Sequence, residues 1–307
     1  MLIIAGGYEG GIIGVDVPLS QEGSPSTGPN DDYIRFRFIC SQGSIRCLAL
    51  GADVLSCGGT DETVQVYTLN NRKKHGDLLL SEGCITALGL SGGLSKGQLL
   101  VGNENGGLAV YGLRHLELLK QLKGEKTAIT SLSVHPNGEL ALSVSEAGGL
   151  RLWDLKTFLC VFYNKLNEPA IKVEWHPSGE DYYILSENQL LKLSLNEETK
   201  PCLYKAQNAN KHTCAAWVGT SIAVGCRSGD VIVYPAGIEH GFAISQVHHR
   251  RIKAIASKEK LVVTGDSDGV LICSSVMSDE QGSPSLVKHW EYDVGMRVNT
   301  LVCRHND

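Results

Sequence analysis

The residues of this sequence best suited to do chemistry are cations in a local cluster. They are a run of four residues, a lysine two positions later and a more distant arginine: His248, His249, Arg250, Arg251, Lys253 and Arg297. Arginine and lysine bind phosphate and carboxylate groups through charge-assisted hydrogen bonds. The formal net charge of the chain is -5, so this cluster stands against an acidic background. These side chains predict a surface that binds an anionic partner.

Enzyme chemistry is not predicted. Catalysis needs a nucleophile, a base and an orienting group that converge, and the sequence has no G-x-S-x-G elbow, Walker loop, H-E-x-x-H motif or dinucleotide fingerprint. His248 and His249 could be imagined as metal ligands, but adjacent strand residues point to opposite faces and no cysteine or acid stands at ligand spacing. We therefore expect no catalytic residue, no metal and no cofactor.

A sequence repeat indicates which elements position these cations. A short turn signal recurs roughly every 40–45 residues, which is the length of a four-stranded propeller blade. The seven signals lie at residues 6–10, 58–62, 102–106, 144–148, 186–188, 225–229 and 265–269, each followed by an alternating strand-like run. The sequence therefore predicts an all-β fold, a seven-bladed β-propeller that forms a single domain over residues 1–307.

The two ends of the chain predict how the propeller closes. We call the strands of each blade a, b, c and d in chain order. The chain begins at residues 2–5 on a strand b with no strand a before it, and residues 297–303 read as a strand a with no strand b after it. The C-terminal strand should therefore complete the N-terminal blade, which leaves no exposed sheet edge at the closure.

One position of strand a can be compared around the propeller, namely the polar residue just inside the strand. We align it as Arg46, Thr86, Thr130, Lys172, Cys214, Lys253 and Asn299. Three of these residues are cations, and with the cluster at 248–251 and Arg297 they predict a basic sector on the wide face of blades seven, one and two. The alternative is that these cations pair locally with the acids of the b–c turns, such as Glu9, Asp61 and Asp268, on a solvated face.

Turn and loop chemistry adds further expectations. At the turn position where a strong repeat places Asp, only Asp61 and Asp268 keep the acid. His135 and His176 each precede a Pro-Asn-Gly or Pro-Ser-Gly turn, so we expect turn residues and not ligands. Residues 18–32 and 276–285 read as mobile c–d loop insertions, and both contain Gly-Ser-Pro-Ser, which leaves open a pair of phosphorylation sites.

The bulk properties are those of an intracellular protein. The first residues lack the basic and long apolar regions of a signal peptide, and no stretch is long and apolar enough to cross a membrane. The ten cysteines are scattered without C-x-x-C pairs, so we expect reduced thiols used as small buried side chains.

Several segments resemble one particular WD-repeat family. They are GSIRCLA (43–49), SCGGTDETV (56–64), TSLSVHPNGELALSV (130–144), LRLWDL (150–155), which holds the one intact Trp-Asp pair, and VEWHPSGEDYY (173–183). The family is that of the p21-activated kinase-interacting proteins, whose yeast member is a maintenance-of-killer protein. The resemblance implies a non-catalytic nucleolar factor in large ribosomal subunit assembly, and animal members are also described as binding and restraining p21-activated kinase.

Two functions therefore remain open. The first is a scaffold on a pre-ribosomal particle that grips ribosomal RNA or an assembly protein with its wide face. The second is a signalling adaptor that binds a p21-activated-type kinase, and a hydrolase in the propeller channel is a weaker third reading. In each of the first two cases we expect a monomer within a larger complex, with no membrane partner. The resemblance implies that the protein is located in the nucleus and nucleolus. The other sequence features, taken without the resemblance, predict a cytoplasmic protein.

Overall fold

The structure, a computed structural model, describes residues 1–17, 33–80, 83–124, 126–196, 200–206, 210–236, 241–244, 246–278 and 284–304. Within these ranges the regular elements are β-strands, which form seven four-stranded antiparallel sheets. This is the strand organisation of a seven-bladed β-propeller, so the predicted fold class is confirmed. The chain divides into two compact units, Met1–Gln42 with Tyr204–Asp307 (unit 1) and Gly43–Leu203 (unit 2).

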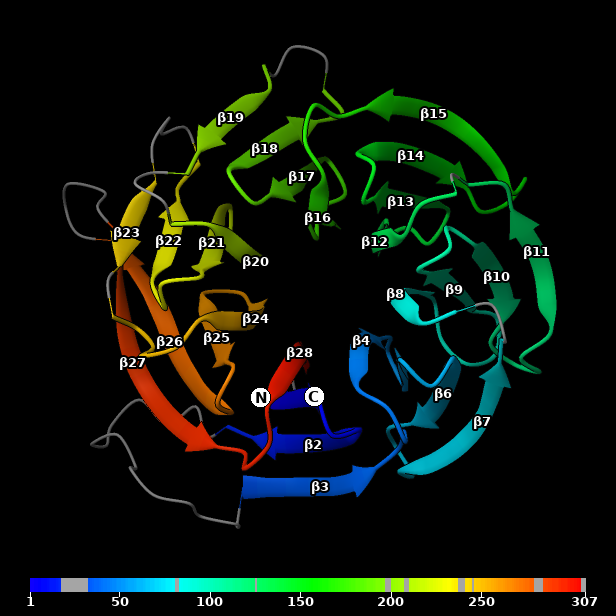
Figure 1. Cartoon of the computed structure of the whole chain (residues 1–307), viewed down its shortest axis with the longest axis horizontal. Helices are drawn as coiled ribbons and strands as arrows, with labels where there is room; N and C mark the ends of the chain where they lie inside the picture. The colour runs from blue at the N-terminus through cyan, green and yellow to red at the C-terminus, as the bar shows by residue number, and fades with distance from the viewer. Residues whose placement is uncertain are drawn as a thin grey trace. The chain divides into compact units, whose positions relative to one another are not determined.

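Unit 2 holds blades 2 to 5, apart from the end of the last strand of blade 5. The strands of these blades are labelled in Figure 1. Blade 2 is β4 (Ile45–Leu50), β5 (Val54–Gly59), β6 (Thr63–Thr68) and β7 (Lys73–Leu79), and blade 3 is β8 (Ile85–Ser91), β9 (Gln98–Asn103), β10 (Leu108–Gly112) and β11 (Leu118–Leu122). Blade 4 is β12 (Ile129–Val134), β13 (Leu140–Ser145), β14 (Gly149–Asp154) and β15 (Leu159–Lys165). Blade 5 is β16 (Ala170–Trp175), β17 (Asp181–Ser186), β18 (Gln189–Ser194) and β19 (Cys202–Lys205).

Unit 1 holds blades 6, 7 and 1. Blade 6 is β20 (His212–Val218), β21 (Ser221–Cys226), β22 (Val231–Tyr234) and β23 (Phe242–Ile244), and blade 7 is β24 (Ile252–Lys258), β25 (Leu261–Asp266), β26 (Val270–Ser278) and β27 (Pro284–Asp293). Blade 1 is β28 (Val298–Arg304), β1 (Leu2–Gly7), β2 (Gly11–Asp16) and β3 (Ile34–Ile39), in that order across the sheet.

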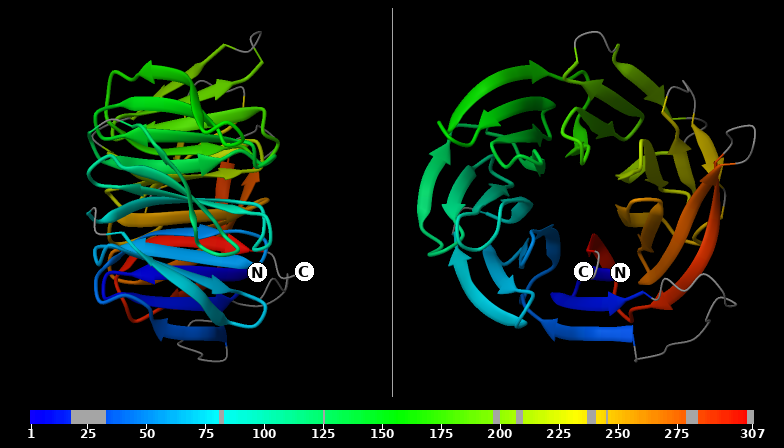
Figure 2. Two further views of the ribbon diagram at one scale, coloured as in Figure 1. Left: turned by 90° about the vertical axis from the view of Figure 1, so that its right-hand side faces the viewer. Right: turned by 180° about the vertical axis from the view of Figure 1, so that it is seen from behind.

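Blade 1 joins the two ends of the chain, as the sequence predicted. β28 pairs antiparallel with β1, with Leu2 opposite Arg304 and Ala5 opposite Leu301. Both views of Figure 2 show the C-terminal strand beside the first strand. The pairing gives the exposed edge of β1 a partner, so the backbone groups along that edge are hydrogen-bonded.

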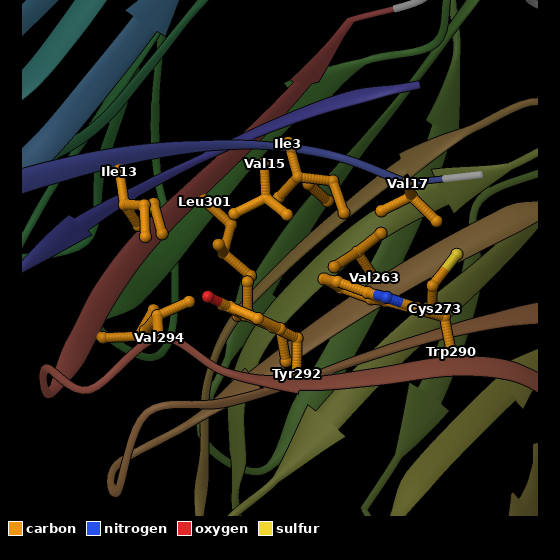
Figure 3. Close-up of a cluster of buried hydrophobic side chains, with 14 of the residues drawn as sticks. Ile3, Ile13, Val15, Val17, Val263, Cys273, Trp290, Tyr292, Val294 and Leu301 are labelled. Atoms are coloured by element: carbon orange, nitrogen blue, oxygen red, sulfur yellow. The ribbon is translucent and has the colours of Figure 1, made fainter. Parts of the chain in front are cut away.

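The core of unit 1 explains why both faces of the inner strands are apolar. Every residue of β1 is buried, so apolar or small side chains are favoured on both of its faces. One buried cluster joins Ile3 and Val15 of blade 1 with Trp290 and Tyr292 of blade 7 (Figure 3). The Trp290 and Tyr292 rings are stacked with their centroids 5.5 Å apart. Burial of each large apolar side chain contributes roughly 1.5–3 kcal/mol to stability.

Every strand a carries a register shift at the same place. Opposite strand b, one residue of each strand a is skipped in the ladder: Arg46, Thr86, Thr130, Ile171, Thr213, Lys253 and Asn299. A bulge of this kind inserts one residue and redirects its side chain. The predicted row was therefore wrong in two blades, where Ile171 and Thr213 take the place assigned to Lys172 and Cys214. The strands were aligned by the alternation of apolar and polar residues. This alignment fails where a bulge inserts one residue, because the pattern after the bulge is shifted by one position.

Half of the second predicted insert is regular structure. Strands β26 and β27 extend into it, with Val276 opposite Leu286 and Ser278 opposite Pro284. A mobile loop over residues 276–285 is therefore wrong for 276–278 and 284–285, because the hairpin simply continues its ladder. Residues 18–32 and 279–283, with the serine of each Ser-Pro pair, lie outside the described residues.

Candidate functional site

His248 begins the predicted cluster, and the structure buries it. Its side chain is 1% exposed. Nδ1 lies 3.1 Å from Asp266 Oδ2, and Nε2 lies 2.8 Å from Thr264 Oγ1. These contacts fasten the loop before β24 to the end of β25. His248 is therefore a structural residue of blade 7 and not part of an exposed surface, which corrects the prediction made for it.

Asp266 is the acid that organises the turn of blade 7. Its Oδ1 accepts hydrogen bonds from the backbone N–H groups of Asp268, Gly269 and Val270, each at 3.0 Å. Burial alone would raise the pKa of this carboxyl, but the hydrogen bonds from His248 and Val270 outweigh it and lower the pKa. The turn acid was predicted two residues later, at Asp268, because the repeats were compared at the exposed end of the turn.

Arg250 and Arg297 are exposed cations that already have acidic neighbours within unit 1. Arg250 Nε donates to Asp268 Oδ2 and Arg297 Nε donates to Glu9 Oε1, both at 3.0 Å. All four side chains are at least half exposed, so solvent screens these pairs and each contributes little to stability. For these two arginines the local-pairing alternative is the better description.

Tyr8 is a surface residue that the sequence-based prediction missed. It is 53% exposed, and the Arg297 guanidinium lies over its ring, 4.2 Å from the centroid. Its backbone N–H also donates to the Arg297 carbonyl at 2.8 Å, which fixes the two residues together. An exposed tyrosine stacked on an arginine is typical of residues that carry binding energy in protein interfaces. The sequence feature that could have identified Tyr8 was its position in the turn at residues 6–10.

Among the predicted site residues of unit 1, Arg251 and Lys253 are the lysine and arginine side chains without an acidic partner among the described residues. Neither forms an ion pair with any described residue. Arg251 is exposed, whereas Lys253 is half-buried at the bulge of β24. Burial, and after it the nearby charge of Arg251, lowers the pKa of Lys253. An anion bound beside this pair would stabilise the charged form of Lys253 and so oppose both effects on its pKa. His249 is exposed beside them.

In unit 2 the two predicted cations lie near acids. Lys172 Nζ lies 3.2 Å from Glu174 Oε2, which also accepts a hydrogen bond from the Tyr183 hydroxyl. Arg46 is exposed at the bulge of β4. The pKa of Glu104 in the next blade is lowered, mainly by its hydrogen bond from the Cys84 N–H and in smaller part by Arg46.

The threonines of the bulge row reveal what this position does in three blades. Thr86 Oγ1 donates to Ile129 O at 2.6 Å, and Thr130 Oγ1 donates to Ala170 O at 2.7 Å. In unit 1, Thr213 Oγ1 donates to Ile252 O at 2.6 Å. Each hydroxyl thus ties one strand a to the strand a of the following blade. Lys253 occupies the same position without a hydroxyl, so its side chain is available for binding.

Other classes of site find no support in the described residues. Over the part of the chain that the structure describes, no group of three or more His, Cys, Asp or Glu side chains could hold a metal ion. In the same residues, no helix is long and apolar enough to cross a membrane. His135 and His176 are turn residues, as predicted, and His135 Nε2 contacts Gly179 O of the neighbouring blade at 2.9 Å.

The fold and the sequence define a WD-repeat β-propeller, a class of scaffold that is typically non-catalytic. The family described as "WD40: WD domain, G-beta repeat" matches residues 116–154, which end at the Trp153-Asp154 pair. The crystal structure titled "Crystal structure of RRP9 WD40 repeats" is similar with a TM-score of 0.76 and 13% identity, over 86% of this chain and 84% of that one. At that identity the likeness concerns the fold alone.

Two relatives place the chain more closely. It is 30% identical over 250 residues to "p21-activated protein kinase-interacting protein 1-like" of Xenopus laevis, covering 80% of this chain and 68% of the relative. It is 32% identical over 199 residues to "Protein MAK11" of Saccharomyces cerevisiae, covering 59% of this chain and 48% of the relative. The chain belongs to the p21-activated protein kinase-interacting protein 1 family. It spans about two thirds of the length of vertebrate relatives.

Proposed function

We propose that this chain is a non-catalytic scaffold in large ribosomal subunit biogenesis. It grips a pre-ribosomal particle through an anionic group, either an RNA phosphate or an acidic segment of an assembly protein. The similarity to Protein MAK11 supports the cellular role, because the sequence resemblance described above implies assembly of the large ribosomal subunit. The observation that carries the binding mode is the Arg251–Lys253 pair of unit 1.

The electrostatics of this pair favour an anion. Lys253 is partly removed from water and faces the like charge of Arg251, and both effects lower its pKa, so a negative group nearby would stabilise its charged form. An anion held between them forms charge-assisted hydrogen bonds to both side chains. The bulge of β24 holds Lys253 on a rigid strand, so binding costs little conformational entropy of the backbone.

The same surface offers a second kind of contact. Tyr8 and Arg297 form a stacked, exposed pair on blade 1, and β28 of blade 1 contacts β24 of blade 7. Aromatic and arginine side chains contribute disproportionately to binding free energy. A partner that covered both features would receive anion recognition from blade 7 and a flat aromatic contact from blade 1.

Sedimentation of the endogenously tagged protein tests the cellular role. The proposal expects the protein to co-migrate with large-subunit precursors, and depletion of the protein to reduce those precursors. Recovery only from light fractions, with unchanged precursor levels after depletion, contradicts it. Repeating the gradient with an Arg251→Glu/Lys253→Glu variant then asks whether the cation pair is the point of attachment.

A kinase adaptor is the second candidate. It is favoured by the name of the Xenopus laevis relative, which describes a protein that interacts with p21-activated kinase. The gradient separates the two candidates, because an adaptor would be recovered with a kinase in light fractions. Localisation of the tagged protein adds a further distinction, since the scaffold proposal expects the nucleolus.

A further inference from the structure

The outer strand of blade 4 is exposed along its whole length. β15 is the last strand of its sheet, paired on one side with β14 (Figure 1). All seven of its residues are exposed. Its large apolar side chains are 48–62% exposed: Leu159, Val161, Phe162 and Tyr163. An exposed apolar strand at a sheet edge is a ready template for another strand.

Other long outer strands carry two or more charged residues each, whereas β15 carries one. β3 contains Arg35 and Arg37, β7 contains Lys73, Lys74 and Asp77, and β27 contains Lys288 and Glu291. Charged side chains on an edge strand oppose pairing with a further strand. The one charged residue of β15, Lys165, stands at its last position.

The bulge residue of the outer strand sharpens this comparison. In blades 1, 2 and 7 the residue skipped between strands c and d is Arg35, His75 or His289, which is basic or polar. In blade 3 the corresponding residue is Leu119, which is 39% exposed, and in blade 4 it is Val161. At this equivalent position blade 4 thus has an apolar side chain, and one that is 56% exposed.

The backbone of β15 sets the kind of occupant. Leu166 N donates to Gly148 O across the hairpin at 2.7 Å, so Leu166 faces β14. Successive residues of an antiparallel ladder alternate in direction, which turns the N–H and C=O groups of Tyr163 and Lys165 away from β14. Groups spaced by two residues along an edge match the spacing of an added β-strand.

The side chains of β15 set the chemistry of that added strand. On one face, Tyr163 lies opposite Arg151, whose guanidinium is 4.5 Å from the ring centroid, and Lys165 follows on the same face. This face is cationic. On the other face, Phe162 lies opposite the half-buried Leu152 and is apolar. Neighbours across two strands prefer opposite charges and matched apolar surfaces.

We infer that β15 is a docking strand for an extended segment of a partner protein in which acidic and apolar residues alternate. The acidic side chains of the segment lie beside Arg151 and Lys165, and its apolar side chains lie beside Phe162. Its backbone continues the sheet of blade 4 as a fifth strand. This surface lies in unit 2 and does not depend on the cation pair of unit 1, so it adds a second attachment point to a scaffold.

A labelled nine-residue peptide of alternating glutamate and valine probes the docking strand, with an alternating lysine–valine peptide as the control. Fluorescence anisotropy should show binding of the acidic peptide and much weaker binding of the basic one. Hydrogen exchange should slow at the amides of Tyr163 and Lys165, which point toward the added strand. If the acidic peptide does not bind, or if protection falls elsewhere, the inference is wrong.

Two variants separate backbone pairing from removal of a side chain. Tyr163→Pro removes an outward N–H that the β14 ladder does not use, so the blade should keep its melting temperature. Tyr163→Ala removes the same ring but retains the N–H. We expect Tyr163→Pro to weaken peptide binding about tenfold beyond Tyr163→Ala, the size of one hydrogen bond. Equal affinities for the two variants would overturn strand pairing.

Charge and self-association provide independent readouts. Lys165→Glu should weaken the acidic peptide and strengthen the basic one without altering the fold, since Lys165 is exposed. Light scattering of the wild-type protein then excludes or establishes a second copy as the occupant. A dimer that Tyr163→Pro converts to monomer, with no peptide binding, would replace the inference by self-pairing.

Discussion

The imidazole Nδ1 of His248 lies 3.1 Å from the carboxylate Oδ2 of Asp266, and both residues are buried in blade 7. This contact joins the loop before strand β24 to the turn after β25. Asp268, in the turn after β25, accepts a hydrogen bond from Arg250. The loop before β24 continues into Arg251 and Lys253. The buried His248–Asp266 pair therefore helps to fix the positions of Arg250, Arg251 and Lys253.

His248→Ala should lower the free energy of unfolding by about 1–3 kcal/mol, because it removes the buried hydrogen bonds to Asp266 Oδ2 and Thr264 Oγ1. Thermal or urea unfolding measures the change. His249→Ala is the matched control, since His249 is exposed at the next position and its removal should be nearly neutral. Equal effects of the two substitutions would contradict the structural role of His248.

Asp266 should make stability depend on pH in the acid range. Burial alone would raise its pKa, but the hydrogen bonds from His248 and from the backbone N–H of Val270 together outweigh this effect, so the pKa is lowered in the folded protein from the ordinary value of 3.8. A group with a depressed folded pKa contributes stability above its unfolded pKa, and that stability is lost as the pH falls through the folded value. The contribution is therefore complete above about pH 4 and fades below it.

Asp266→Asn should flatten this acid limb while lowering stability at neutral pH. Unfolding curves recorded between neutral pH and the acid range would show it. Asp268→Asn serves as the comparison, because Asp268 is exposed and pairs with Arg250 on the surface. A variant at Asp266 that retained the full acid dependence would assign that dependence to other carboxylates.

Arg251 and Lys253 should govern binding to nucleic acid. Replacing both by glutamine should reduce affinity for single-stranded ribosomal RNA and lower the log–log salt slope by about 0.7 for each phosphate that is no longer neutralised. Filter binding over a range of salt concentrations gives both quantities. Lys258→Gln provides the control, because it removes one exposed charge from the far end of β24. No difference from the control would remove RNA phosphate as the ligand.

Lys253→Thr should increase stability and weaken anion binding together. A threonine there would complete the pattern of Thr86, Thr130 and Thr213, with its hydroxyl donating to Val298 O of the next strand a. We expect a gain of about 0.5–1.5 kcal/mol, the net value of one hydrogen bond. Thr213→Val is the reciprocal test and should cost a similar amount. Calorimetry on both variants measures the two changes. A Lys253→Thr variant that is no more stable than the wild-type protein would contradict the prediction.

Much of the fold could be predicted because it depends on local patterns. The alternation in residues 2–5 and 297–303 specified two strands that lacked partners, and the pairing of Leu2 with Arg304 joins them. The Pro-containing turns after His135 and His176 were equally local. The single-domain organisation stays a prediction, and the structure describes two compact units.

The candidate site was predicted less well for a physical reason. A β-bulge adds one residue to a strand, so the position of Ile171 could not be told from that of Lys172 by alternation. Whether a charge is available depends on tertiary neighbours, such as Glu174 beside Lys172 or Asp268 beside Arg250. The burial of His248 has the same origin, because its partners come from the following strand.

The bulge of strand a has a consequence for how such a repeat can change over time. The skipped residue takes no part in the pairing with strand b, so its side chain can vary while the ladder stays intact. A threonine, an isoleucine, an asparagine, an arginine and a lysine all occur there in this one chain. Each blade therefore has one position, the skipped residue of strand a, at which a substitution can change partner binding with little effect on folding.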